Sequence, residues 1–256
     1  MLKHRIIPIL LWDGDQVVQS VKFCRPHRKC GSMREHIRVM EKRNVDELII
    51  LDVNATIEGR EPKFDLIKKY AGELFCPVTY GGGISKIEHV EKLIMECGVD
   101  KIAINACTFK QPEIIRDLAS KFGSQSIVYS IDVSRKWSLN GLWYHTRTPN
   151  DKPFMTSSLM LDVVKTFRPG EVLITSIDHN GTREGYELDT LNLAGKLGGI
   201  PIIINGGCGS PEHMKQALEA GASAVAASSM FLFTEHTPRS VARELAREGL
   251  AVRTDG

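Results

Sequence analysis

The sequence predicts an α/β protein with a (β/α)8, or TIM, barrel fold and a twofold internal half-barrel repeat. Short β-branched segments alternate with helical segments along the whole chain. One strand motif occurs twice, at 47–56 (ELIILDVNAT) and at 171–182 (EVLITSIDHNGT). The chain also has 256 residues, which is the usual size of one such barrel.

The repeat extends beyond the strand motif. Segment 77–84 (PVTYGGGI) corresponds to 201–207 (PIIINGG), and 97–105 (CGVDKIAIN) corresponds to 220–228 (AGASAVAAS). A repeat of half the chain is too long for a solenoid unit. It predicts two half-barrels, about 1–123 and 124–256, within one domain spanning 1–256. The alternative, an open doubly wound sheet, does not predict two equivalent halves.

Short apolar segments give the expected strands, in chain order 5–11, 47–52, 78–80, 101–104, 127–132, the strand that opens at Glu171, 201–204 and 224–227. Helical spacing predicts helices at 33–42, 64–73, 87–97, 112–122, 157–167 and 238–248. Segment 12–32, with its basic core KFCRPHRKC, is expected to be a loop. Segment 133–153 is expected to form a hairpin around Asn140-Gly141.

Composition narrows the function classes. A net charge of +2 is too balanced to indicate a nucleic acid or an anionic membrane as partner. The apolar start of the chain is interrupted by Pro8, and no long apolar run follows, so neither a signal peptide nor a membrane span is expected. Six scattered cysteines are typical of reduced thiols in a cytoplasmic protein.

One cluster has the spacing of metal ligands. Cys24, His27 and Cys30 are close enough in sequence to bind zinc, but a fourth ligand is not evident. Incidental thiols in a mobile basic loop are the favoured interpretation. We therefore expect neither a metal nor another cofactor.

Glycine-rich turns follow the third and seventh strands. Their backbone N–H groups would lie beside helix N-termini, an arrangement that binds anions. The alternative is that the glycines serve only as tight turns, but the pattern occurs in both halves, which favours two phosphate sites and a bisphosphorylated small molecule. The predicted phosphate-binding residues are Gly82, Gly83 and Asn105 in the first half and Gly181, Gly206, Gly207, Ser228 and Ser229 in the second.

Three carboxylates end strands at the mouth of the predicted barrel: Asp52, Asp132 and Asp178. Apolar surroundings raise the pKa of a carboxyl group into the range that serves acid–base catalysis. For Asp52 and Asp178, capping of the following loop or positioning of a ligand is an equal alternative. Asp132 is the predicted catalytic residue, because no glycine turn after it needs a cap.

Four charged residues open strands at the opposite end: Arg5, Glu47, Lys101 and Glu171. Two cations and two anions at one opening can form a ring of alternating charge around the barrel axis. The alternative is four unconnected surface charges, which would contribute little stability. A ring at that place would seal or gate passage along the axis.

The segments RIIP, ELIILD, GGGI, DKIAIN, SIDVSR, LITSIDHNGT, INGGCG and AVAASS together resemble the cyclase subunit family of imidazole glycerol phosphate synthase, almost end to end. The resemblance implies that a glutaminase subunit docks on the N-terminal face of the barrel and that ammonia travels through the barrel. It implies that Asp132 acts as an acid–base catalyst. It also implies an ammonia gate formed by Arg5, Glu47, Lys101 and Glu171. Finally, it implies a set of phosphate-binding residues: Gly83, Asn105, Asp178, Gly207 and Ser228.

The sequence departs from this family at the end of the first strand. The family has an Asp there that pairs with the residue equivalent to Asp132, whereas this chain has Leu11. A basic residue in the following loop is replaced by Gln19. Loss of one acid–base group costs about 10²–10⁴-fold in rate. The departure resembles a branch associated with amidination of surface-polysaccharide sugars, in which ammonia passes to a separate ATP-dependent synthetase.

Three hypotheses follow from the sequence. The first is a barrel subunit of a glutamine amidotransferase complex that receives ammonia, with a sugar amidotransferase as a further partner. The second is an authentic cyclase in which Asp13 takes the place of the missing carboxylate. The third is a non-catalytic scaffold whose upper face binds another protein.

Overall fold

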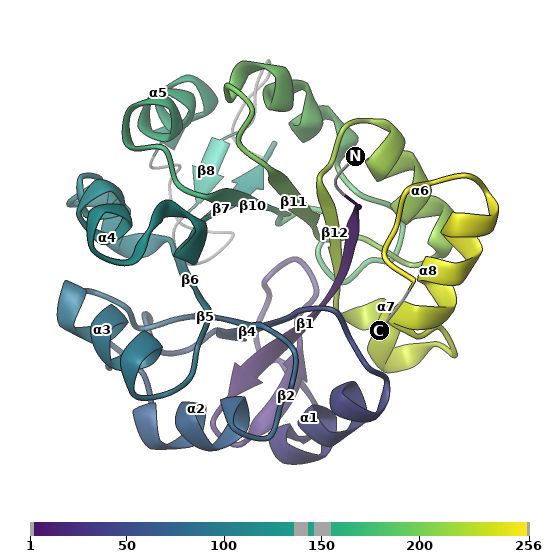
Figure 1. Cartoon of the computed structure of the whole chain (residues 1–256), viewed down its shortest axis with the longest axis horizontal. Helices are drawn as coiled ribbons and strands as arrows, with labels where there is room; N and C mark the ends of the chain where they lie inside the picture. Colours follow the sequence, from purple (N-terminus) through teal and green to yellow (C-terminus); the bar gives the residue numbers. More distant parts are fainter. Residues whose placement is uncertain (1–2, 136–142, 146–154, 255–256) are drawn as a thin grey trace.

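The structure is a computed structural model that describes residues 3–135, 143–145 and 155–254. Eight parallel strands pair side by side, and β10 closes the circle by pairing with both β11 and β7. The predicted (β/α)8 barrel is therefore confirmed, and Figure 1 shows helices surrounding its strands. In chain order the barrel strands are β1 (Arg5–Asp13), β4 (Leu48–Asp52), β5 (Val78–Gly81), β6 (Lys101–Ile104), β7 (Ile127–Ser134), β10 (Glu171–Ser176), β11 (Ile202–Asn205) and β12 (Ala224–Ala227).

The helices pack their apolar faces on the outside of the barrel. Local sequence fixes several of their starts: Thr156 accepts a hydrogen bond from Leu159 N, and Thr237 forms a capping box with Ser240. The α-helices are α1 (Met33–Lys42), α2 (Phe64–Ala71), α3 (Ile87–Met95), α4 (Ile114–Phe122), α5 (Ser157–Phe167), α6 (Pro211–Glu219), α7 (Ser229–Phe233) and α8 (Pro238–Arg247). Short 3-10 helices are η1 (Ala106–Phe109), η2 (Ser124–Ser126) and η3 (Leu188–Lys196).

Side chains alternate between the inside and the outside of the barrel, as the two-residue period of a strand requires. Along β1, Ile7 and Ile9 face the interior, whereas Ile6 and Leu10 pack toward the helices. The interior is filled by the buried side chains of Ile7, Ile9, Leu11, Val18, Ile49, Ala103, Val128, Leu173, Ile203, Ala224 and Ala226.

Because of this alternation, residues at the two ends of one strand can both face the barrel interior. Arg5 and Leu11 lie six residues apart on the same inward face of β1, so one stands at the N-terminal end and the other at the C-terminal end. Lys101 and Asn105 have the same relationship along and just beyond β6, as do Glu171 and Thr175 along β10. Charged side chains at the floor and polar or apolar ones at the mouth therefore share one axis.

The expectation of a loop at 12–32 was wrong in part. Strands β2 (Gln16–Gln19) and β3 (Arg28–Ser32) extend β1 as an antiparallel sheet above the barrel. Val17 and Val18 are buried in this extension, and the sequence shows only this one apolar pair there. Between the two strands, residues 20–27 form the loop that covers the barrel mouth.

A second antiparallel extension follows β7. Strand β7 pairs with β8 (Trp143–His145), which pairs in turn with β9 (Met155–Thr156). A hairpin after the fifth barrel strand was predicted, and this pairing agrees with it. Its expected turn at Asn140-Gly141 lies outside the described residues.

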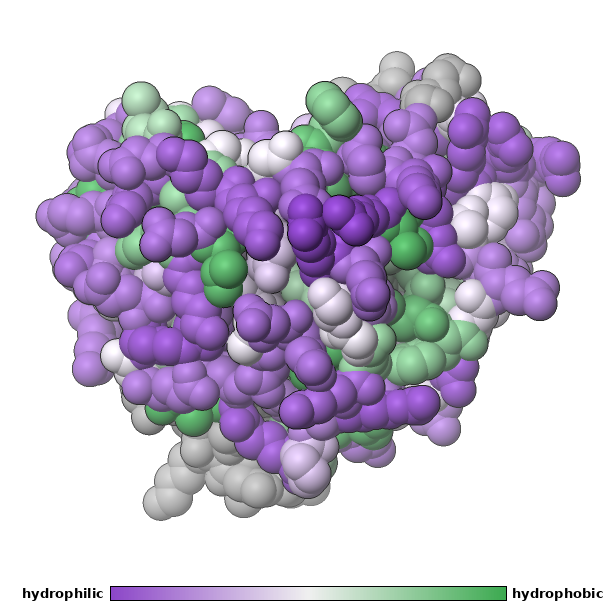
Figure 2. Space-filling view, turned by 90° about the horizontal axis from the view of Figure 1, so that it is seen from below, coloured by the Kyte–Doolittle hydropathy of each residue, from purple (hydrophilic) through white to green (hydrophobic). Residues whose placement is uncertain are grey.

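The ends of the described chain meet beside the barrel, where His4 N donates a hydrogen bond to Ala251 O over 2.7 Å. Figure 2 shows that one side of the molecule is largely hydrophilic, with smaller hydrophobic patches, as expected for the outer faces of the surrounding helices. Every helix within residues 3–135 and 155–254 is too short or too polar to cross a lipid bilayer.

Candidate active site

A cavity of about 170 Å³ opens at the C-terminal ends of the strands. In this fold, functional residues gather at that end of the barrel. Three predicted residues of the first half, Gly82, Gly83 and Asn105, line the cavity together with Asp52 and Asp132. Sequence motifs that lie as much as eighty positions apart are thus brought into one site.

Asp132 lies inside this cavity near the end of β7. Asn105 Nδ2 donates a hydrogen bond to Asp132 Oδ2 over 2.8 Å. Burial raises the pKa of Asp132 to about 7, and the hydrogen bond from Asn105 opposes that rise only in part. A carboxyl group with this pKa is present in both protonation states at neutral pH, so it can accept or donate a proton there.

The carboxylate of Asp52 is held by hydrogen bonds within the protein and is not free in the cavity. Its carboxylate accepts two hydrogen bonds from Arg60, each 2.8 Å long, and its side chain is only 1% exposed. The same carboxylate accepts bonds from the backbone N–H groups of Asn54 and Ala55. This geometry agrees with the capping alternative. Arg60 was not predicted as a site residue, because nothing in the sequence of the loop after β4 marks it as the partner of Asp52.

The glycines after β5 permit a close approach of two loops. A Cβ at Gly82 would lie 2.5 Å from Asp52 O, and the residue has φ +120°. Both features require glycine. The glycines therefore serve as a tight turn, and Gly82 and Gly83 both line the cavity wall.

A smaller recess adjoins the main cavity in the second half of the barrel. It is lined by all five glycines and serines predicted there: Gly181, Gly206, Gly207, Ser228 and Ser229. Asn180 and Asn205 line both the recess and the main cavity, so they stand where the two meet. We call this space the second recess, and the Gly82–Gly83–Asn105 wall of the main cavity the first recess.

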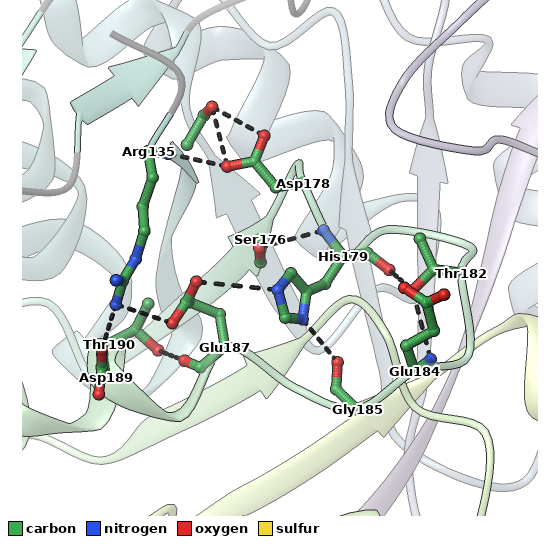
Figure 3. A network of polar contacts seen from close by, with 11 residues as sticks. Arg135, Ser176, Asp178, His179, Thr182, Glu184, Gly185, Glu187, Asp189 and Thr190 are labelled. Carbon is green, nitrogen blue, oxygen red and sulfur yellow. Dashed lines mark hydrogen bonds and ion pairs between the residues drawn. The ribbon is translucent and has the colours of Figure 1, made fainter. Parts of the chain in front are cut away.

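Asp178 does not line the second recess. Its carboxylate accepts hydrogen bonds from Ser134 Oγ at 3.0 and 3.1 Å and from Arg135 N at 2.8 Å. Figure 3 shows this contact beside the network of Arg135, His179 and Glu187. Asp178 thereby ties the end of β7 to the loop after β10, which is a positioning role.

The four charged residues at the strand entrances form a closed ring. Arg5 Nη1 lies 2.7 Å from Glu47 Oε2, and its Nη2 bonds Glu171. Lys101 Nζ lies 3.0 Å from Glu47 Oε1 and 2.9 Å from Glu171 Oε2. Each cation therefore touches both anions, and each anion touches both cations. The ring stands at the floor of the barrel, on the axis of the cavity above.

Comparison with known proteins places the chain in a family. The model of the family described as histidine biosynthesis protein matches residues 5–237. A Campylobacter jejuni protein provisionally named imidazole glycerol phosphate synthase subunit hisF2 is 41% identical over 99% of both chains. Imidazole glycerol phosphate synthase subunit HisF of Thermobifida fusca is 37% identical over 98% of this chain and 99% of its own. The HisF subunit of Dictyoglomus turgidum is 38% identical over the full length of both.

The chain belongs to the HisF family of imidazole glycerol phosphate synthase subunits.

In this HisF-family barrel the end of the first strand presents an apolar side chain to the cavity. Leu11 is 8% exposed and lies in register with Val18 on one side and Leu51 on the other. Asp13, the hypothetical substitute carboxylate, ends β1 opposite Gln16 and is not among the residues that line the cavity. The wall that the end of β1 contributes to the cavity is therefore the apolar side chain of Leu11.

The loop over the mouth of this HisF-family barrel contributes two basic residues that were not predicted to line the cavity. Arg25 and His27 both line the cavity, and Arg25 also bonds Asn54. Burial and the nearby charge of Arg25 lower the pKa of His27, and Asp13 opposes this shift. The sequence marked Arg25 only by the basic character of the loop, and it marked His27 only as a possible zinc ligand.

The zinc alternative gains no support from the geometry. Cys24, His27 and Cys30 occupy the loop and strand above the mouth, and both thiols are free. Within the described part of the chain, no three His, Cys, Asp or Glu side chains converge as metal ligands would.

Proposed function

We propose that this HisF-family chain is the ammonia-accepting barrel subunit of a glutamine amidotransferase complex, and that it serves the amidination of a sugar in surface polysaccharide synthesis. One observation carries the proposal. A closed ring of Arg5, Glu47, Lys101 and Glu171 stands at the floor of the same axis that leads to the cavity holding Asp132.

The interior between ring and cavity suits a neutral nucleophile. Its walls are Ile, Leu, Val and Ala side chains, which favour uncharged ammonia over ammonium because an ion would lose its hydration there. These side chains pack against one another, and the ring is closed by direct ion pairs. Passage of ammonia would therefore require the ring to open when a partner binds, which is the action of a gate.

A glutaminase subunit at the N-terminal face is the partner that the proposal requires. Phe75 lies between α2 and the start of β5, on that face, and is 94% exposed. Met95, the last residue of α3, is 73% exposed. Exposed apolar side chains on this face are compatible with the docking of another protein, which would cover them. Hydrolysis of glutamine in such a partner would yield glutamate and the ammonia that enters the barrel, in the cytoplasm and without a cofactor in this chain.

The mouth of the barrel supports binding of a phosphorylated small molecule. The first and second recesses are each lined by glycine backbone, and Arg25 adds positive charge to the rim. Asp132, with a pKa of about 7, would assist proton transfer to or from ammonia or its acceptor. With Leu11 on the facing wall, a separate ATP-dependent synthetase would complete the amidination.

Histidine-pathway cyclisation is the second candidate function, and two observations favour it. The relatives from Thermobifida fusca and Dictyoglomus turgidum carry the name HisF, and Asp132 has the pKa of an acid–base catalyst. An assay of the purified chain with the ribulosyl bisphosphate substrate and an ammonium salt separates the candidates. The first proposal predicts no imidazole product above the uncatalysed rate, and sustained turnover would replace it by the second.

A scaffold role is tested with the partner proteins. The glutaminase and the sugar amidotransferase should be captured together by the tagged chain, and ammonia transfer should fail in Lys101→Ala although capture persists. If transfer in Lys101→Ala equals that of the wild type, the chain acts as a scaffold and the gate proposal is wrong.

A further inference from the structure

The loops after β10 and β11 touch through their backbones beside the second recess. Gly185 N donates a hydrogen bond to Gly207 O over 2.8 Å. A Cβ at Gly207 would lie only 1.9 Å from Gly185 O. Since Gly207 lines the second recess, the position of Gly185 determines the shape of one of its walls.

His179 holds Gly185 from the other side. In Figure 3 the ring of His179 lies between the Gly185 carbonyl and the Glu187 carboxylate. Its Nδ1 is 2.8 Å from Gly185 O, and its Nε2 is 3.8 Å from Glu187 Oε2. A carbonyl oxygen only accepts hydrogen bonds, so Nδ1 must carry the proton whether the ring is neutral or charged.

Further contacts fix the orientation of the ring. Glu187 accepts a hydrogen bond from Arg135 Nη2 at 3.0 Å, and its carbonyl accepts one from Thr190 Oγ1 at 2.7 Å. The His179 backbone is held as well, because Thr182 Oγ1 donates to its carbonyl at 2.9 Å. The side chain of His179 is 36% exposed, so it is not a core residue whose removal would leave a large buried cavity.

The next residue faces the opposite way. Asn180 lines both recess and cavity, is 9% exposed, and its Oδ1 has no hydrogen-bond partner among the described residues. A buried unpartnered polar atom is costly unless a ligand or water satisfies it. Asn180 is thus placed to contact a ligand directly, whereas His179 contacts the loop that shapes the site.

We infer that His179 is a positioning residue of the second recess: through its hydrogen bond to the Gly185 carbonyl it holds the Gly207 backbone in the conformation that admits a phosphate group. This inference rests on the proposed function, which places a phosphorylated molecule there. His179 itself does not touch the ligand.

Two variants separate this role from a general effect on stability. The amide nitrogen of Asn can occupy nearly the place of Nδ1, so His179→Asn keeps a donor for Gly185. The longer side chain of Gln places its nitrogen near Nε2, so His179→Gln does not. His179→Ala removes both. Thermal unfolding of all three should resemble that of the wild type, because the side chain is partly exposed.

The experiment is a titration of the full-length, ¹⁵N-labelled chain with inorganic phosphate, followed by the backbone amide signals in NMR. The amide of Gly207 reports on the second recess and that of Gly83 on the first. We expect phosphate to bind wild type and His179→Asn alike at Gly207, and His179→Gln and His179→Ala about fivefold more weakly, the effect of one hydrogen bond. Binding at Gly83 should be the same in all four proteins.

Three results would overturn the inference. Equal phosphate affinity at Gly207 in the Asn and Gln variants would show that the Nδ1 donor is not what matters. A parallel loss at Gly83, or a common fall in melting temperature, would show a general structural effect. If phosphate leaves the Gly207 amide of the wild type unchanged, the second recess is not a phosphate site, and the proposed function loses that part together with this inference.

Discussion

Asn105 donates a hydrogen bond to Asp132 and so links the ends of β6 and β7 inside the cavity, with 2.8 Å between Nδ2 and Oδ2. The bond favours the ionised carboxylate, whereas burial favours the neutral acid. The fraction of Asp132 that is ionised at neutral pH depends on the balance of these two effects.

Substitution of Asn105 should shift that balance. In Asn105→Ala we expect the pKa of Asp132 to rise from about 7 by roughly half to one unit, since one hydrogen bond to the charged form is lost. Titration of the ¹³C-labelled Asp132 carboxyl by NMR measures the change. Asn205→Ala is the matched control, because Asn205 lines the same cavity but donates to Thr175. An equal shift in both variants would contradict the account.

Asp132→Asn should alter the pH dependence of stability. A carboxyl whose pKa is raised on folding binds its proton more tightly in the folded chain, so the folded protein loses stability as pH rises from about 4 to about 7. The neutral Asn avoids this loss. We expect the variant to be more stable than wild type by about 1–4 kcal/mol at pH 8 and equally stable near pH 3.5. Urea unfolding at both pH values tests this, and a constant difference would rule it out.

Removal of one ring anion should destabilise the floor of the barrel. Burial acts to raise the pKa of Glu171, but the ion pairs with Arg5 and Lys101 outweigh it and hold the pKa below its usual value. Stability from such a group is present above its unfolded pKa and is lost as pH falls through its folded pKa. Glu171→Gln should therefore cost about 3 kcal/mol at pH 7, and the cost should shrink as the pH falls through the lowered pKa of the folded protein.

The control for the ring is an exposed ion pair. Glu73 lies 3.1 Å from Arg34 on the outer surface. Glu73→Gln should cost less than about 1 kcal/mol at any pH, because solvent screens such pairs. Equal costs for Glu73→Gln and Glu171→Gln in denaturant unfolding would mean that the ring has no special stability.

Arg60 should prove essential to the loop after β4. Without it the nearly buried carboxylate of Asp52 keeps only backbone partners, and we expect Arg60→Met to cost about 3 kcal/mol. Asp52→Asn with Arg60→Met removes the uncompensated charge and should recover part of that loss. A double-mutant cycle in urea measures the coupling, and strictly additive losses would argue against the pairing.

Leu11→Asp introduces a carboxylate at the end of the first strand, where the resemblance to the cyclase family implies one. We expect ammonium-dependent cyclisation of the ribulosyl bisphosphate substrate to increase by at least about 100-fold, the effect of one acid–base group. Adding Asp132→Asn to this variant should remove the gain. If Leu11→Asp turns over no faster than wild type, residues beyond this pair have lost the family chemistry.

Much of the fold was predictable because it depends on local patterns. The bounds of α1 and α5 agree with the helical spacing, and α2, α3 and α8 end one or two residues earlier than predicted, where helix ends are least defined. Strands β2 and β3 were missed because their pairing depends on β1 rather than on their own composition.

Residues of the site could be predicted from the sequence only where they lie at the ends of barrel strands. Asp132 and Asn105 follow from the rule that functional residues stand at the C-terminal ends of barrel strands. Arg60 and His179 act through partners in irregular loops, and no periodic pattern marks such contacts. Asp178 was expected beside a phosphate group, but its bonds to Ser134 and the Arg135 backbone could be seen only in three dimensions.

The passage of ammonia through the ring is tested most directly with isotopes. The reconstituted complex receives [¹⁵N-amide]glutamine in the presence of excess unlabelled ammonium, and the ¹⁵N content of the amidinated product is measured. Channelling predicts a product that carries mainly ¹⁵N with the wild type and the bulk isotope ratio with Lys101→Ala, although glutaminase remains bound. A wild-type product at the bulk ratio, or equal enrichment with both chains, would contradict the account.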